Sequence, residues 1–119
     1  MREVTDHKVT NTRDELTIQV VDEPGAGGAN HAYIYTGPDG TPWGAVNFQN
    51  GAIQEKGVNG ITNEVLLATV IDRLRSFQAG PYPSDFNQLA LQYAESALHV
   101  LQDRTRERIS RGVEGQEKA

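Results

Sequence analysis

Hydrophobic and polar positions follow different periods in the two halves of the chain. Up to about residue 58, short apolar and β-branched runs alternate with clusters of glycine, proline and asparagine, which is the pattern of strands joined by turns. From residue 59 on, apolar residues recur at helical spacing in two long segments, separated by Gly80, Pro81 and Pro83. The pattern predicts an α+β fold, in which a small N-terminal antiparallel β-sheet precedes a long C-terminal α-helical hairpin.

Strand-like runs occupy much of the N-terminal half, at Leu16–Val21, His31–Thr36 and Gly44–Gln49. Between the last two, Pro38-Asp39-Gly40 supplies a turn, because proline fixes φ and glycine permits a positive φ. Ala52–Lys56 follows the Asn50-Gly51 turn and is expected to return as a further short strand. Residues 1–15 are polar with little periodicity, so we expect a flexible arm, with an added edge strand as the alternative.

Capping residues delimit the two predicted helices. Thr62 is a suitable N-cap for the first, which continues to about Gln78. Ser84 caps the second, which continues to about Arg111, and Gly112 fits its C-terminal stop. We therefore expect one domain over residues 1–119, composed of the arm 1–15, a β-rich part 16–58, the helical hairpin 59–112 and a tail 113–119.

The second helix is long for a protein of this size. A single helix over residues 85–111 extends about 40 Å, whereas a compact globule of 119 residues is about 35 Å across. A helix as long as the body that it should cover indicates a hairpin that packs against another copy. We expect an obligate homodimer or a dimer-based hexamer.

Composition excludes several classes of function. The net charge of −5 and the pI near 5.1 argue against general binding to DNA, RNA or anionic membranes. The chain has no cysteine and no apolar stretch long enough to span a membrane, so we expect a soluble protein of the cytoplasm. Its three histidines are scattered without metal-ligand spacing, and its serines lack a nucleophile motif, so we expect no catalytic residues, metal or cofactor.

Positive charge nevertheless gathers near the end of the second helix. Arg104, Arg108 and Arg111 follow at i, i+4 and i+7 and so share one helix face. The planar guanidinium fork matches a phosphate, so this face is a candidate anion site, the alternative being a solvated face that offsets the helix dipole. Phe77 could be core, a dimer contact or a stacking plate for a base. Asn87 could hydrogen-bond an adenine or simply help the first helical turn.

The motifs appear in a recognisable order: FQNG at residues 48–51, GVNGITNE at 57–64, the Gly80-Pro81 link and RGVEG at 111–115. Over about residues 44–116 this order resembles the first Thoeris anti-defence family of phages, and the hairpin is similar to that of the second anti-CBASS family. Both families are sponges that bind cyclic nucleotide immune signals without cleaving them. The resemblance therefore implies a protein of the host bacterial cytoplasm that sequesters glycocyclic ADP-ribose and so blocks activation of the Thoeris effector.

The resemblance also implies roles for individual residues. Phe77 would stack on adenine, Asn87 would hydrogen-bond it, and Arg104 and Arg108 would hold the phosphates. Which linkage isomer is preferred stays open, as does a second pocket for cyclic di- or trinucleotides at Arg111, Gly112, Val113 and Glu114. A signal-degrading hydrolase and a helical-hairpin interaction module are the competing functions.

Spacing supports a shared ligand site. Asn87 and Arg104 are 17 residues apart on one predicted helix, which is about 25 Å and roughly twice the span of a dinucleotide-sized ligand. One hairpin cannot present both residues to one ligand. Antiparallel pairing of two hairpins would join Phe77 and Asn87 of one copy to Arg104 and Arg108 of the other, and would create two pockets per dimer.

Overall fold

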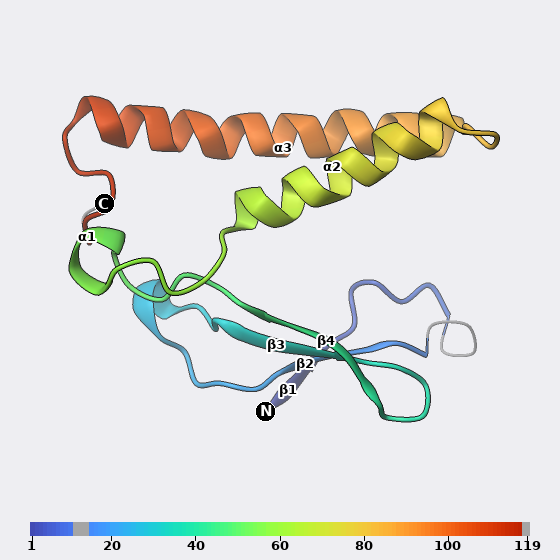
Figure 1. Ribbon diagram of the computed structural model, residues 1–119, viewed down its shortest axis with the longest axis horizontal. Coiled ribbons are helices and arrows are strands. Elements are labelled where there is room, and N and C mark those ends of the chain that lie inside the picture. Colours follow the sequence, from blue (N-terminus) through green and yellow to red (C-terminus); the bar gives the residue numbers. More distant parts are fainter. Residues whose placement is uncertain (11–14, 118–119) are drawn as a thin grey trace. The chain divides into compact units, whose positions relative to one another are not determined.

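Figure 1 shows the computed structural model of the protein, in which residues 1–10 and 15–117 are described. The chain forms two compact units, Met1–Ile61 and Thr62–Ala119, of which the first holds the strands and the second the two long helices. This arrangement confirms the predicted α+β class. Residues 11–14 of the expected arm and 118–119 of the expected tail lie outside the described residues.

The first unit is built on a four-stranded antiparallel sheet in the order β1-β2-β3-β4. Its strands are β1 (Arg2–Val4), β2 (Thr17–Val20), β3 (Ala32–Thr36) and β4 (Pro42–Asn47). The register aligns Val20 with Tyr33 and Tyr33 with Val46, which places these three side chains on one face of the sheet. Val20 is only 1% exposed and is the most buried of the three. The three runs predicted as strands are confirmed as β2, β3 and β4.

Two expectations for the first unit are wrong. Arg2–Val4 is not part of a flexible arm, because it pairs with β2 as an edge strand, which was the alternative prediction. The segment expected to return as a strand after Ala52 instead forms one helical turn, α1 (Ile53–Lys56). Its helical bonds run to the Ala52 carbonyl oxygen, which accepts the backbone N–H groups of Glu55 and Lys56 at 3.0 and 2.8 Å.

Side-chain amides from the FQNG and GVNG motifs close the loop that carries α1. The Asn50 backbone N–H donates to Asn59 Oδ1 at 2.8 Å, and Asn59 Nδ2 donates back to the Asn50 carbonyl at 2.8 Å. Gln49 accepts the Asn59 backbone N–H at 2.9 Å and donates to the carbonyl oxygens of Gly51 and Gly57. Each amide thus replaces a backbone partner that an irregular loop would lack. The FQNG and GVNG motifs therefore stabilise the closed conformation of the loop that carries α1.

Gly60 completes this loop by a close approach of two backbone segments. A Cβ atom at Gly60 would lie 2.4 Å from the Phe48 carbonyl carbon, which no side chain can satisfy. The approach lets Ile61 form a parallel bridge with Phe48, with its N–H donating to the Asn47 carbonyl at 2.9 Å. A residue other than glycine at position 60 would force this bridge apart.

The second unit is the predicted helical hairpin, with α2 (Asn63–Ala79) and α3 (Asp85–Ser110) side by side and antiparallel (Figure 1). Both predicted N-caps are confirmed: Thr62 Oγ1 accepts the Val65 N–H and Ser84 Oγ accepts the Asn87 N–H. An ion pair of 2.8 Å between Arg75 and Glu95 crosses between the two helices. No helix of the described residues is both long enough and apolar enough to cross a membrane.

The hairpin buries little apolar surface for its size. Among the described residues of this unit, the buried apolar side chains are Ile71 and Leu91. Many large apolar side chains are instead exposed: Val65, Val70, Phe77, Tyr82, Phe86, Leu89, Tyr93, Val100 and Ile109. Two helices in contact along one stripe cannot cover the other apolar positions of either helix, so much of this surface is available to a further partner.

Candidate functional site

The four arginines between residues 104 and 111 differ in what they contact. Arg106 is paired with Asp103 at 2.9 Å, and Arg111 forms an ion pair with Glu107 one turn earlier. Arg104 is exposed, and its guanidinium contacts no carboxylate or other hydrogen-bonding group within residues 15–117. Of this group it is therefore the arginine most available to an external anion.

The guanidinium of Arg108 is buried, although Arg108 shares a helix face with the exposed Arg104. Its side chain is 6% exposed, because the chain after α3 folds back over it. Nε donates to Glu114 Oε2 at 3.2 Å, and Nη2 donates to the carbonyl oxygens of Val113 and Gln116 at 2.9 and 2.7 Å. The i, i+4, i+7 pattern places Arg108 on a helix face but carries no information about a tail that covers it.

The RGVEG segment forms the turn that ends α3. Gly112 has φ 73°, and its N–H donates to the Ile109 carbonyl, while the Val113 N–H donates to the Arg108 carbonyl. This pair of bonds is the Schellman arrangement, which requires a left-handed residue that glycine adopts without strain. The predicted stop at Gly112 is confirmed. Of the four residues considered for a second pocket, Val113 and Glu114 contact Arg108, whereas Arg111 contacts Glu107.

Phe77 lies near the end of α2 and is not a core residue. Its side chain is 51% exposed, and the Arg73 guanidinium carbon lies 5.5 Å from the ring centroid, one helical turn earlier. A cation over a ring is held by the ring quadrupole and restricts how the ring can turn. Phe77 is therefore an exposed aromatic plate supported by Arg73.

Asn87 lies in the first turn of α3, where its backbone N–H and its side-chain amide have different roles. Its backbone N–H is used by the N-cap, at 3.0 Å from Ser84 Oγ. Its half-buried side-chain amide makes no hydrogen bond to any other residue of the described chain. The amide therefore keeps donor and acceptor capacity for a polar ligand.

One hairpin does not bring the four predicted site residues together. Phe77 near the end of α2 and Asn87 near the start of α3 flank the link between the two helices, whereas Arg104 and Arg108 lie in the last two turns of α3. Asn87 and Arg104 are 17 positions apart on one continuous helix, which corresponds to about 25 Å. The helix predicted from the sequence is confirmed, and with it the separation that motivated a shared site.

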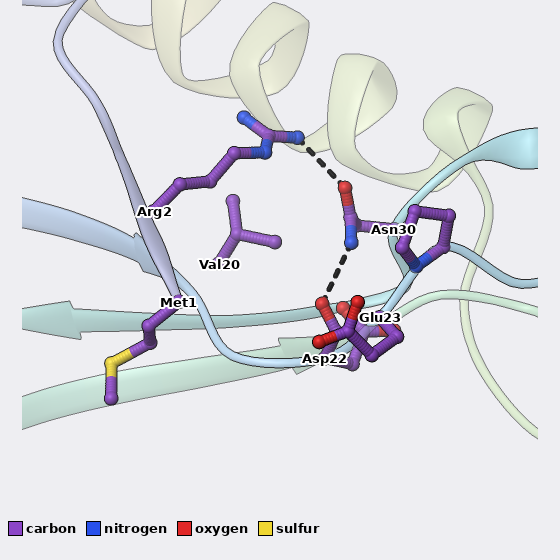
Figure 2. Close-up of a pocket in the computed structure, with 7 residues that line it drawn as sticks. Met1, Arg2, Val20, Asp22, Glu23 and Asn30 are labelled. Carbon is purple, nitrogen blue, oxygen red and sulfur yellow. Dashed lines mark hydrogen bonds between the residues drawn. The ribbon is translucent and has the colours of Figure 1, made fainter.

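The hairpin has an apolar groove of about 400 Å³ between the start of α2 and the second half of α3, lined by Asn63, Leu66, Leu67, Val70 and Leu101. The sheet unit has a separate pocket of about 250 Å³ beside Val20, shown in Figure 2. There Arg2 Nη2 donates to Asn30 Oδ1 at 2.8 Å, and Asn30 Nδ2 donates to the Asp22 carbonyl oxygen. The His31 backbone N–H donates to the Asp22 carboxylate and lowers the pKa of that group. None of the predicted site residues lines either space.

The fold and these positions define a helical-hairpin protein with an exposed aromatic ring at one end of the hairpin and, toward the other, an arginine that has no partner among the described residues. The sequence model of the Acb2/Tad1 hairpin domain matches residues 44–106, and the chain belongs to this family. The chain is also 49% identical over 70 residues to Thoeris anti-defense 1 of Bacillus phage SBSphiJ7. That stretch is 59% of this chain and 49% of the relative, so the match spans about half of the relative's length. The family predicted from the motifs is confirmed.

Sequence reasoning missed two features near the site. Arg73 stands four residues before Phe77, and this i, i+4 spacing on a helix was a sufficient signal for the cation–π contact. The contacts that bury Arg108 had a weaker signal. The only hint was an acidic residue, Glu114, that follows the Gly112 stop within reach of the last helical turn.

Proposed function

We propose that this protein is a phage anti-defence sponge, which binds glycocyclic ADP-ribose signals in the host bacterial cytoplasm and holds them without cleavage. The observation that carries the proposal is membership of the Acb2/Tad1 hairpin family, since the matched residues 44–106 include Phe77, Asn87 and Arg104. The name of its relative, Thoeris anti-defense 1, supports the narrower statement that the protein counters Thoeris immunity. Removing the signal would keep the Thoeris effector inactive.

The available groups suit the parts of such a ligand. Phe77 offers a half-exposed ring for stacking on adenine, an interaction between flat π-faces. The Asn87 amide can pair with an adenine edge through one donor and one acceptor. Arg104 offers an exposed guanidinium to the phosphates. Arg108 reaches a phosphate only if Val113 and Gln116 release it, so we assign the first phosphate contact to Arg104.

A second copy of the chain completes the pocket in this proposal. The separation of about 25 Å along α3 keeps Asn87 and Arg104 of one chain from the same small ligand. Antiparallel association would bring Asn87 of one copy near Arg104 of another. The small number of buried apolar side chains in the hairpin also favours association, because the uncovered apolar surface is stabilised by a partner. The assembly would be a homodimer or a dimer-based hexamer, with two pockets per dimer.

A capture experiment tests the function. Protein is mixed with glycocyclic ADP-ribose, unbound ligand is removed by filtration, and the retained fraction is heat-denatured and analysed for intact ligand. Intact ligand recovered in stoichiometric amount supports the sponge, and recovery unchanged by EDTA supports a site without metal. A hydrolysis product would establish a signal-degrading hydrolase instead, and no capture would favour a helical interaction module. A sponge must bind tightly: nanomolar affinity corresponds to about −12 kcal/mol.

The same assay with other ligands addresses the open points. A panel of linkage isomers of cyclic ADP-ribose identifies the preferred one. Cyclic di- and trinucleotides test for a second pocket near Arg111, Gly112, Val113 and Glu114. Competition between a trinucleotide and glycocyclic ADP-ribose would place both in one pocket, and independent capture would establish two.

Mixed dimers test the shared pocket. Neither Asn87→Ala nor Arg104→Ala should capture ligand well as a homodimer. Heterodimers of the two variants would have one pocket with both lesions and one with none, so they should regain about one site per dimer. If heterodimers confirmed by native mass spectrometry capture no more than either parent, the pocket lies within one chain.

A further inference from the structure

One face of α3 is exposed along nearly the whole helix although it carries large apolar side chains. Six residues follow the alternating spacing of four and three: Phe86, Ala90, Tyr93, Ala97, Val100 and Arg104. All six are exposed, and the three largest apolar side chains, Phe86, Tyr93 and Val100, are 88%, 68% and 64% exposed. At about 100° per residue the six positions fall within about 80° of helix circumference, so they form one seam. This spacing is the a/d repeat of a coiled coil.

The seam is self-complementary when it is reversed. A two-fold axis at residue 95 exchanges Phe86 with Arg104, Ala90 with Val100, and Tyr93 with Ala97, so the set maps onto itself. In both fully apolar pairs a larger side chain meets an alanine, which allows two helices to approach closely and interdigitate. The remaining pair sets an aromatic ring against a guanidinium, a favourable cation–π combination. No pair joins two like charges.

A different face of the same helix packs against α2. Leu91 is buried there, and Glu95 forms its ion pair with Arg75 of α2. The seam is therefore not used within the hairpin. The apolar groove borders it, because Leu101, which lines the groove, follows directly after Val100 of the seam. In the reversed register, Ala90 and Asn87 of another copy would approach the groove from the same side.

We propose that α3 of a second copy lies antiparallel along this seam, in the register centred on residue 95, and that Phe86 positions Arg104 of that copy for a ligand phosphate. The proposal deepens the proposed function and rests on its second copy. It assigns Phe86 a role that the family motifs did not indicate. Phe86 precedes Asn87 in sequence. Arg104 of the second copy, when it contacts the Phe86 ring, would therefore lie close to the pocket to which Asn87 contributes. The register is compatible with the shared pocket, because a pocket that opposes Asn87 to Arg104 is centred at residue 95.5, beside the seam's own axis.

Thiol cross-linking tests the register directly, because the chain has no cysteine of its own. The double variant Ala90→Cys/Val100→Cys places the two introduced thiols opposite each other twice per dimer. Both positions are exposed in the single chain, so the substitutions should be tolerated. Within one chain, or between two equivalent positions, the separation is about 15 Å along the axis, far above the roughly 7 Å Cα limit of a disulfide. Mild oxidation should yield a covalent dimer from the double variant and monomer from each single variant.

Each alternative outcome has a definite meaning when native mass is measured before oxidation. A non-covalent dimer that fails to cross-link, or a single variant that does cross-link, overturns this register but leaves the shared pocket standing. A monomeric protein overturns both the register and the shared pocket. Capture of ligand by the unmodified protein is measured separately, so failure of the sponge itself is recognised independently.

The positioning role of Phe86 needs its own readout. Phe86→Ala should weaken capture of glycocyclic ADP-ribose about fivefold, the size expected for loss of one cation–π contact, and Phe86→Trp should restore it. In an Arg104→Ala background the Phe86→Ala change should have little further effect, because the contact is already absent. Tyr82→Ala is the matched control: Tyr82 is equally exposed at 85% but lies in the link before α3. Additive losses at Phe86 and Arg104, or an equal loss at Tyr82, would rule out the assigned role.

Discussion

Arg108 offers the clearest test of how the end of the hairpin is held together. The substitution Arg108→Ala removes a buried guanidinium that bonds to the Glu114 carboxylate and to the carbonyl oxygens of Val113 and Gln116. These three contacts join the last turn of α3 to the segment that follows it. We expect the variant to lose stability at the C-terminal end of the second unit.

The magnitude follows from the burial of each partner. Hydrogen bonds from a charged donor contribute about 1.5–3 kcal/mol each when they are fully buried. The Glu114 side chain is 39% exposed, so its pairing with Arg108 contributes at most about 1 kcal/mol. In the variant the carbonyl oxygens of Val113 and Gln116 regain water, which offsets part of their loss. The net cost is about 2 kcal/mol, or a fall in melting temperature of roughly 6–10 °C for a chain of this size.

Thermal unfolding and amide hydrogen exchange measure the effect, and Arg104→Ala is the matched control. Arg104 stands one helical turn earlier, is exposed and has no partner among the described residues, so its removal should change the stability of the hairpin itself by less than about 0.5 kcal/mol. The contact proposed above with Phe86 of a second copy acts on assembly instead. Exchange at the Val113 amide, which donates to the Arg108 carbonyl, should accelerate in the Arg108 variant alone. If melting and Val113 exchange both match the unmodified protein, the contacts around Arg108 do not stabilise the fold and the reasoning is refuted.

Three further predictions concern the aromatic plate, the amide contacts and the sheet loop. Phe77→Ala should abolish most ligand capture but lower the free energy of unfolding by less than about 1 kcal/mol, since the ring is 51% exposed. Phe77→Trp should retain capture. A large fall in stability to urea in the alanine variant would instead place the ring in a core. Asn59→Ala removes both side-chain hydrogen bonds to Asn50 and should lower the free energy of unfolding in urea by about 1–2 kcal/mol. Asn59→Asp keeps the acceptor and should be less destabilising. Equal stability of both variants and the unmodified protein would contradict a stabilising role for these bonds. The pKa of Asp22 is lowered in the folded protein, so its contribution is present above its ordinary value of 3.8 and is lost as pH falls through the lower folded value. In the Asp22→Asn variant the free energy of unfolding should therefore fall less steeply between roughly pH 4 and pH 2. An unchanged pH dependence in this range would exclude a stabilising role for the Asp22 carboxylate.

Elements defined by local chemistry were predictable from the sequence. Thr62 and Ser84 start the helices because each side-chain oxygen accepts an otherwise unpaired N–H, and Gly112 ends α3 because its positive φ closes the Schellman turn. These signals lie within a few residues of what they specify. The same holds for the long α3, whose length separates Asn87 from Arg104.

Features that depend on distant or returning segments were not predictable. Arg2–Val4 becomes a strand only because β2 offers an unpaired edge, and its own polar sequence shows no alternation. Residues 53–56 form a helical turn because Gln49 and Asn59 draw the ends of the loop together, which leaves too little chain for a returning strand. The burial of Arg108 depends on a tail that folds back on the helix. In each case the structure depends on a contact between residues that the hydrophobic pattern of the sequence does not relate to each other.

In the proposed function, assembly and ligand capture would place the same demand on α3. In a lone chain the seam exposes Phe86, Tyr93 and Val100, a costly apolar surface that a second copy would cover. If that copy also supplies Arg104 to the pocket, the ligand binds only the assembled form. Each occupied pocket then stabilises assembly by RT ln(1 + [L]/Kd), about 4 kcal/mol at a thousandfold excess over Kd. Release of ligand would then require either breaking the arginine contact or parting the seam. Slow release is what a stoichiometric sponge needs, because a bound signal must stay bound for as long as the host could respond to it.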